Sequence, residues 1–196
     1  MADVMKTLGA SNHSKSKREV NDYYATPKYA TLELLKREKF YPTIIEPAVG
    51  GGHIAEVLED NGYQVQGYDI IDRDYKNTIV KDFMTIDIDE LPKRFDIVTN
   101  PPYGITEDFV SYCLNIVPIG TKIAMLLPIR FLEGQKRYKI INSINPPKSC
   151  HVFVKRVYCY KNGIPTDDSS AVCYGWFIWE KGYIGKTEVD WIPPER

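Results

Sequence analysis

The stretch Phe95-Asp96-Ile97-Val98-Thr99-Asn100-Pro101-Pro102-Tyr103 predicts a buried strand that runs into a rigid loop. Its first five residues include one aromatic and three β-branched side chains, which is typical of a short core strand. The two prolines end the strand because they lack a backbone donor and fix φ. Asn100 is therefore expected at the carboxyl end of a strand, which is the edge at which open α/β sheets bind ligands.

The side chains of this loop suit one kind of ligand. The Asn100 side chain and the Pro101 carbonyl provide two hydrogen-bond acceptors, and Tyr103 provides a flat surface for stacking. The pattern predicts a binding site for a planar group that carries an exocyclic amine.

A second informative stretch lies upstream. The sequence predicts a short strand from Thr43 to Glu46 and a glycine-rich turn from Pro47 to Gly52. It then predicts a helix from His53 to Asp60, which stops at Asn61-Gly62. Glycines are needed where the backbone passes close to a ligand and turns into a helix. The third glycine of the dehydrogenase fingerprint is not met, which argues against NAD as the cofactor.

Two acidic residues follow the next predicted strands. Residues 64–68 alternate as a strand that ends in Asp69, where a carboxylate can accept both ribose hydroxyls of a nucleoside cofactor. Residues 78–81 predict a third strand, which is followed by Asp82 and Phe83.

These elements, in this order, resemble S-adenosylmethionine-dependent amino-methyltransferases of the Asn-Pro-Pro-Tyr type. The chain is most similar to the small adenine-specific (N6) DNA methyltransferases of phages and prophages, over roughly residues 23–179. The resemblance implies that the catalytic residues are Asn100, Pro101, Pro102 and Tyr103.

The resemblance also implies a set of cofactor-binding residues. Glu46, Pro47, Gly50 and Gly52 match the family's Glu-Pro-x-x-Gly-x-Gly turn. The remaining members would be Tyr24 and Thr26 of a Tyr-x-Thr-Pro element, Asp69, Ile70, Asp82, Phe83 and Asn100. Thr26 is also a good N-cap for a helix predicted from Pro27 to about Lys39.

The alternation of strands and helices implies an α/β fold with a mostly parallel sheet. By resemblance it is a Rossmann-like class I methyltransferase, with seven strands of which the last is antiparallel. Residues 1–20 are polar, carry a basic cluster and are expected to form a mobile arm. Residues 21–196 are expected to be a single catalytic domain, since 196 residues suit one core.

The charge balance limits the partners. The chain has 25 Lys and Arg against 26 Asp and Glu, so any nucleic-acid surface must be local. Arg130, Lys136 and Arg137 are the candidates for contact with a nucleic-acid substrate, together with Tyr103. No segment is large enough for a separate recognition domain, which predicts short contacts or a protein partner that supplies target recognition. We expect a cytoplasmic protein with no membrane span and no metal site.

Several substrates remain open at this stage. DNA adenine is favoured, but an RNA adenine or guanine methyltransferase and a protein-glutamine methyltransferase use the same or closely related signatures. A non-catalytic regulatory protein that binds S-adenosylmethionine is a further alternative.

Overall fold

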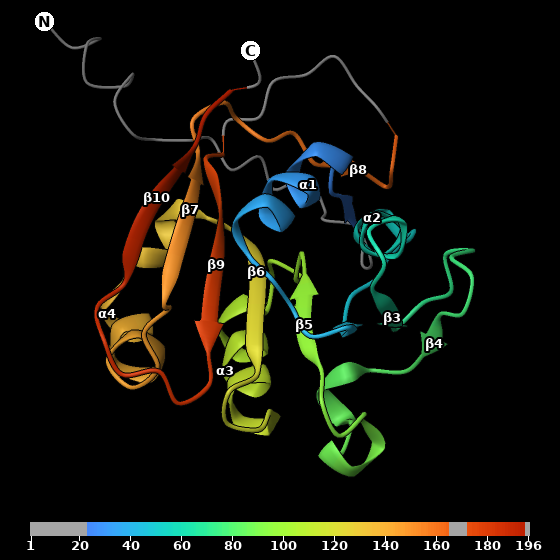
Figure 1. Ribbon diagram of the computed structural model, residues 1–196, viewed down its shortest axis with the longest axis horizontal. Helices are drawn as coiled ribbons and strands as arrows, with labels where there is room; N and C mark the ends of the chain where they lie inside the picture. Colours follow the sequence, from blue (N-terminus) through green and yellow to red (C-terminus); the bar gives the residue numbers. More distant parts are fainter. Residues whose placement is uncertain (1–22, 165–171, 195–196) are drawn as a thin grey trace, which may run out of the picture.

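The computed structural model describes residues 23–164 and 172–194, so the predicted arm at residues 1–20 lies outside the described residues. The main element is an eight-stranded sheet in the order β10-β7-β9-β6-β5-β2-β3-β4 (Figure 1). Its strands are β10 (Glu188–Ile192), β7 (Ser149–Phe153), β9 (Tyr174–Glu180), β6 (Lys122–Pro128), β5 (Asp96–Thr99), β2 (Thr43–Glu46), β3 (Gln64–Asp69) and β4 (Ile79–Val80).

Only one strand of this sheet runs against the others. β9 pairs antiparallel with both β6 and β7, while every other pair is parallel. The predicted α/β class with a mostly parallel sheet is confirmed. The sheet has eight strands where seven were predicted, because β10, which follows β9 in the chain, adds an edge strand that pairs parallel with β7. The antiparallel strand is therefore the penultimate one and not the last.

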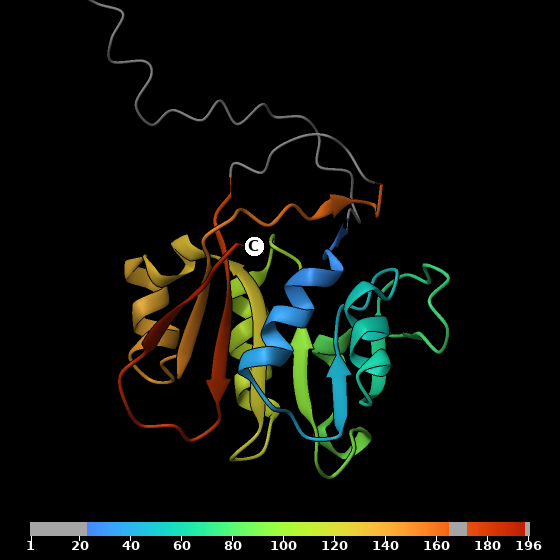
Figure 2. The ribbon, with the colours of Figure 1, turned by 45° about the horizontal axis from the view of Figure 1, so that its top comes forward.

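Helices cover both faces of the sheet (Figures 1 and 2). The elements on one face are α1 (Lys28–Arg37) and α2 (His53–Asp60), and those on the other are α3 (Thr106–Ile116), α4 (Gln135–Arg137) and the π-helical turn η4 (Tyr138–Asn142). Three short 3-10 turns are η1 (Phe83–Thr85), η2 (Ile88–Glu90) and η3 (Ile129–Leu132). In the described ranges no helix combines the length and the apolar character needed to cross a bilayer.

The core consists of two apolar layers separated by the sheet. On the α1 side, Leu34 packs with Val98, and the indole of Trp176 donates a 2.8 Å hydrogen bond to the Ala30 carbonyl. On the α3 side, Phe109 packs with Ile97 and Trp179. Alternate residues of β5 and β9 thus enter opposite layers, as expected for central strands that are covered on both faces.

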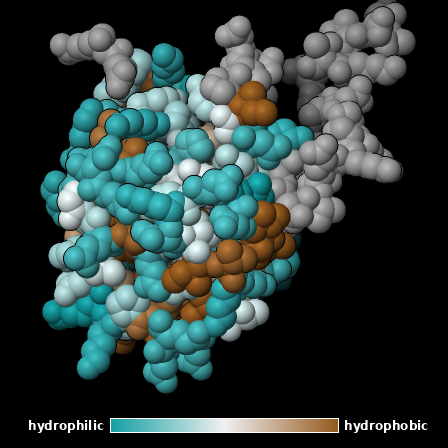
Figure 3. Space-filling view, turned by 90° about the vertical axis from the view of Figure 1, so that its right-hand side faces the viewer, coloured by the Kyte–Doolittle hydropathy of each residue, from teal (hydrophilic) through white to brown (hydrophobic). Residues whose placement is uncertain are grey.

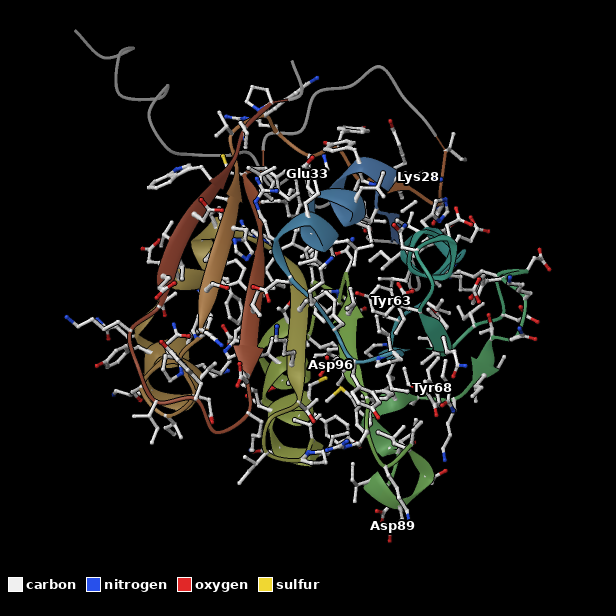
Figure 4. All side chains as sticks on the ribbon, in the orientation of Figure 1. Lys28, Glu33, Tyr63, Tyr68, Asp89 and Asp96 are labelled. Atoms are coloured by element: carbon white, nitrogen blue, oxygen red, sulfur yellow. The ribbon has the colours of Figure 1, made fainter. Side chains whose placement is uncertain are left out.

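A buried carboxylate fixes the amino ends of the central strands. Asp96, labelled in Figure 4, accepts hydrogen bonds from the backbone N–H groups of Tyr41 at 2.6 Å and Lys122 at 2.7 Å. Tyr41 precedes β2 and Lys122 begins β6, so one side chain aligns three neighbouring strands. The carboxyl ends of these parallel strands therefore lie at the opposite edge, where β6 extends beyond β5, since Thr99 pairs with Met125 and β6 continues to Pro128.

A second, two-stranded sheet crosses that edge. β1 (Tyr24–Ala25) pairs antiparallel with β8 (Tyr160–Lys161). Figure 2 shows the segment that carries β8 passing above the carboxyl ends of the parallel strands. We call residues 23–26 and 157–164 together the roof.

The glycine turn between β2 and α2 is shaped by two tyrosines. Gly52 has φ of 81°, and a Cβ placed there would lie 2.1 Å from the Tyr75 ring. Gly50 has φ of 54°, and its Cβ would lie 2.8 Å from the Tyr23 ring. A residue with a side chain is excluded at both positions by backbone conformation and by space.

Gly52→Ala is expected to destabilise the fold more than Gly62→Ala does. Gly62 has φ of 89°, and a Cβ placed there would meet open space. Gly62→Ala therefore measures the cost of the backbone strain alone, about 1 kcal/mol. Gly52→Ala adds the displacement of Tyr75 and should cost about 2 kcal/mol or more. Urea unfolding followed by circular dichroism gives both values, and equal losses would show that Tyr75 moves without cost.

Candidate functional site

A cavity of about 760 Å³ lies between the roof and the carboxyl ends of β2, β3, β5 and β6. Parallel strands present their last residues at one edge, so side chains far apart in the sequence meet here. All four residues of the Asn100 to Tyr103 loop line the cavity, as does Arg130. So do all the predicted cofactor-binding residues except Gly52: Tyr24, Thr26, Glu46, Pro47, Gly50, Asp69, Ile70, Asp82, Phe83 and Asn100.

Gly52 has a different place from the one predicted. It lies beneath Tyr75 and ends the turn as the N-cap of α2, in the left-handed conformation. Its role in this structure is to let the chain enter the helix, while Gly50 is the glycine that borders the cavity.

The carboxylate of Asp69 holds two loops together. Its Oδ2 accepts from the Gly50 backbone at 2.8 Å, and its Oδ1 accepts from the Ile71 backbone at 3.0 Å. Each carboxylate oxygen can accept a further hydrogen bond, so both remain able to bind hydroxyl groups in the cavity. Asp82 is anchored similarly, since its Oδ1 accepts from Met84 N at 2.9 Å.

Apolar groups flank these acids. Phe83 is buried against Tyr68, with ring centroids 5.4 Å apart, whereas Ile70 is 59% exposed. Apolar patches interrupt the hydrophilic surface at this side of the molecule (Figure 3), and Ile70, Ile79 and Val80 are exposed in the β3–β4 part of the chain. Carboxylates beside apolar surfaces suit a nucleoside, which carries hydroxyl groups and an apolar ring.

Glu46 is the most deeply buried acid of the cavity. Its side chain is 1% exposed, and its Oε2 accepts no hydrogen bond from the described residues. Burial raises the pKa of Glu46 well above its ordinary value, although a hydrogen bond from the Ala55 backbone opposes this. Burial therefore favours the protonated carboxyl more than it would be favoured in an exposed glutamate.

The amide of Asn100 has a fixed orientation. Its Nδ2 donates to the Tyr24 carbonyl and to Thr26 Oγ1, both at 3.1 Å. A carbonyl can only accept, so the atom that faces Tyr24 must be the nitrogen. Asn100 Oδ1 thus points away from these partners, and it is buried without a hydrogen bond from any described residue. This acceptor is available for a donor that enters the cavity.

Tyr103 lies between two other tyrosines. Tyr24 stacks on it with ring centroids 6.1 Å apart, and Tyr174 packs beside it at 6.0 Å. Burial raises the pKa of Tyr103 well above its usual value, so its hydroxyl stays neutral. The predicted stacking surface is thus present but covered by the ring of Tyr24, a residue that is itself 39% exposed.

Thr26 does not cap α1 as predicted. The helix begins at Lys28 with Pro27 in the N-cap position and no side-chain cap. Thr26 is 3% exposed, and its hydroxyl meets Asn100 instead.

The predicted basic contacts differ in their surroundings. Arg137 donates to Glu107 Oε1 at 2.8 Å and to the carbonyls of Glu133 and Arg130, and it lies over Phe131. Lys136 is exposed and pairs with Glu107 Oε2 at 3.1 Å. Arg137 therefore stabilises its own loop, whereas Arg130 is exposed and lines the cavity, as does the exposed Lys161.

Several lining residues had not been singled out from the sequence. Tyr23 supports Arg73, whose guanidinium lies 4.5 Å from the ring centroid. His53, Tyr158, Cys159 and Tyr174 also border the cavity. For Tyr23, the only signal in the sequence was its position directly before the Tyr-x-Thr-Pro element. Residues 158–161 of the roof are brought to the cavity by the pairing of β8 with β1, a tertiary contact that local sequence patterns do not predict. Within the described residues no cluster of His, Cys, Asp and Glu could hold a metal ion.

No protein-family model and no curated protein sequence matches this chain. Solved structures do match its fold. A protein from Vibrio vulnificus YJ016, described as a modification subunit of a type I restriction enzyme, superposes with a TM-score of 0.62 at 10% identity. The match covers 87% of this chain and 47% of that protein, so the chain spans about half of its length.

Two further matches have different substrates in their names. The 23S rRNA methyltransferase ErmE has a TM-score of 0.55 and 20% identity, over 81% of this chain and 69% of ErmE. A predicted O-methyltransferase from Agrobacterium tumefaciens has a TM-score of 0.55 and 14% identity, over 86% of both chains. The chain therefore has the Rossmann-like fold of class I methyltransferases.

Asp69→Ala is expected to weaken S-adenosylmethionine binding roughly ten- to hundredfold. It removes charged acceptors that are worth about 1.5–3 kcal/mol together. Asp72→Ala is the matched control, because Asp72 Oδ1 accepts from the Asp74 backbone at 3.0 Å in the same loop and is not part of the cavity lining. Calorimetric titration measures both, and equal affinities would remove Asp69 from the binding site.

Glu46→Gln is expected to flatten the pH dependence of stability. With a raised pKa, folded Glu46 keeps a proton that the unfolded chain releases, so its contribution to the unfolding free energy falls as pH rises above the ordinary value of 4.5. Gln removes this loss and should raise stability at pH 8 relative to wild type. Urea unfolding at pH 5 and pH 8 measures the effect, with Glu56→Gln, exposed on α2, as the control. A wild-type pH dependence in Glu46→Gln would contradict the assignment.

Proposed function

We propose that this protein is an S-adenosylmethionine-dependent methyltransferase that acts on the exocyclic amine, N6, of adenine in DNA. The observation that carries the proposal is the buried acceptor Asn100 Oδ1, which has no donor among the described residues and lies beside Tyr103 in the lining of the cavity. The Asn-Pro-Pro-Tyr sequence and the fold support the same conclusion.

The cofactor would be held by the acidic half of the cavity. Asp69 would accept the ribose hydroxyls, Asp82 and Phe83 would bind the adenine, and Glu46 would face the charged amino-acid end. A cationic neighbour favours the charged form of a buried carboxyl, which would supply the partner that Glu46 Oε2 lacks. When bound, this cofactor supplies an electrophilic methyl group.

Asn100 would act on the target nitrogen. The lone pair of an aromatic amine is delocalised into the ring, which makes the amine a weak nucleophile. Asn100 Oδ1 and the Pro101 carbonyl would accept its two N–H groups and favour a pyramidal nitrogen as the new bond forms. The nitrogen gains a methyl group and then releases one proton to solvent.

The aromatic residues would position the planar base. Tyr103 offers a stacking face once the exposed ring of Tyr24 turns aside, and Pro102 makes the loop that carries Tyr103 rigid. A base in duplex DNA must leave the helical stack to reach this depth. Arg130, with Lys136 near it, would contact the phosphate backbone.

The direct test is transfer of a tritiated methyl group from S-adenosylmethionine to duplex DNA, single-stranded DNA, RNA and protein. Digestion to nucleosides then identifies the product, which should be N6-methyldeoxyadenosine. RNA is the second candidate, since ErmE is named as a 23S rRNA methyltransferase and superposes over 81% of this chain. Label in RNA adenine would favour it, and label in glutamine would favour a protein substrate.

Target recognition is proposed to come from short elements or from a partner. The sheet and its helices occupy most of the described residues, and the chain matches 47% of a protein described as a subunit of a restriction enzyme. A short or relaxed target sequence is expected for the chain alone.

Asn100→Ala is expected to abolish methyl transfer and to leave the affinity for S-adenosylmethionine within about threefold, because the lost acceptor faces the target. Tyr103→Phe should keep most of the activity, since the ring face is retained. Single-turnover transfer and calorimetry separate the two effects. Asn61→Ala, which removes an amide bonded to the Val57 carbonyl at the end of α2, is the control. A binding-only regulatory protein would show cofactor affinity without turnover in wild type.

A further inference from the structure

The orientation of the Asn100 amide depends on the segment before α1. Both N–H groups of its Nδ2 have acceptors there, the Tyr24 carbonyl and the Thr26 hydroxyl, each at 3.1 Å. Two acceptors in different directions fix the amide plane, whereas one acceptor leaves the side chain free to turn. The direction of Oδ1 is therefore set by residues 74 and 76 positions away in the sequence.

Thr26 contributes its buried hydroxyl to this contact. It is 3% exposed, and its hydroxyl has no role in capping α1. Asn100 Nδ2 also donates a long hydrogen bond of 3.9 Å to Cys159 Sγ, which is a weak acceptor. Burial raises the pKa of Cys159 to about 12, against a hydrogen bond with Thr26 that lowers it, so the thiol is neutral at physiological pH. A neutral sulfur is a weaker acceptor than a hydroxyl or a carbonyl, so the Thr26 hydroxyl and the Tyr24 carbonyl are the main acceptors that hold the amide nitrogen.

The roof holds the backbone of this segment. Tyr24 pairs with Lys161 and Ala25 with Tyr160, and the Asn162 N–H donates to the Tyr23 carbonyl at 2.8 Å. The Tyr24 carbonyl that faces Asn100 is therefore held in position by β8.

We propose that Thr26 is a positioning residue for methyl transfer: with the Tyr24 carbonyl, it holds the Asn100 amide so that Oδ1 faces the target amine. This inference rests on the proposed function of Asn100. It gives Thr26 a different role from the cofactor contact that the sequence resemblance implies. Without the hydroxyl, the amide can turn and present its NH2 group, a donor, to an amine that needs an acceptor.

The test compares Thr26→Val with Thr31→Val. Thr31 lies on α1, is fully buried and makes no hydrogen bond through Oγ1 to the described residues, so it undergoes the same chemical change without losing a contact. On the nucleic acid that wild type methylates, Thr26→Val should lower kcat roughly ten- to hundredfold and leave KM and the calorimetric Kd for S-adenosylmethionine within about twofold. Thr26→Ser should restore kcat to within about threefold of wild type. Thr31→Val should match wild type.

Two results would overturn the proposal. One is a wild-type kcat in Thr26→Val. The other is a tenfold weaker Kd for S-adenosylmethionine with kcat unchanged, which would make Thr26 a cofactor contact. If Thr26→Val does not fold, Thr26→Ser against Thr26→Ala makes the same comparison.

A measurement without substrate separates this proposal from the proposed function. The side-chain amide protons of Asn100, assigned in NMR spectra by their loss in Asn100→Ala, should exchange with solvent faster in Thr26→Val and not in Thr31→Val. Unchanged exchange would show that Thr26 does not hold the amide, whether or not methyl transfer is found. Absence of transfer by wild type to every substrate would instead count against the proposed function.

Discussion

The site depends on the alignment of the parallel strands. Glu46, Asp69 and Asn100 each end or follow a parallel strand, and pairing in register brings these ends to one edge. β9 runs in the opposite direction, so its first residue and not its last lies at that edge. This is why Tyr174 reaches the ring of Tyr103 from a strand that otherwise forms core. One reversed strand thus adds an aromatic side chain to a site otherwise made of strand ends.

The roof and the glycine turn form one packed unit. A Cβ at Gly50, Gly51 or Gly163 would lie within 3 Å of the Tyr23 side chain. Glycine at these positions therefore makes room for an aromatic ring of the same chain and not only for a ligand. The Arg73 guanidinium also lies over the Tyr23 ring. Tyr23 therefore connects the turn after β2, the loop after β3 and the segment around β8.

Local patterns predicted most of the fold. The strand at 43–46 and the helix at 53–60 have the predicted bounds, because hydrophobic periodicity and glycine act over a few residues. β10 was missed because four of its five residues are exposed, and its pairing with β7 is a tertiary event. Thr26 and Arg137 show the same limit. Their sequence neighbours suggested a helix cap for Thr26 and a phosphate contact for Arg137. The partners that decide their roles, Asn100 and Glu107, are distant in the chain.

The charges of the cavity bear on how the amine would react. Its described carboxylates are Glu46, whose pKa burial raises, and Asp69 and Asp82, which already accept backbone hydrogen bonds. None of these is placed against Asn100 by a hydrogen bond, and the side chains around the amide are neutral tyrosine, threonine and cysteine. A route in which a base removes a proton before transfer therefore has no base beside Asn100 in the described part of the chain. For the proposed reaction, this arrangement favours attack by the neutral amine, made more nucleophilic by the Asn100 acceptor, with the proton lost afterwards.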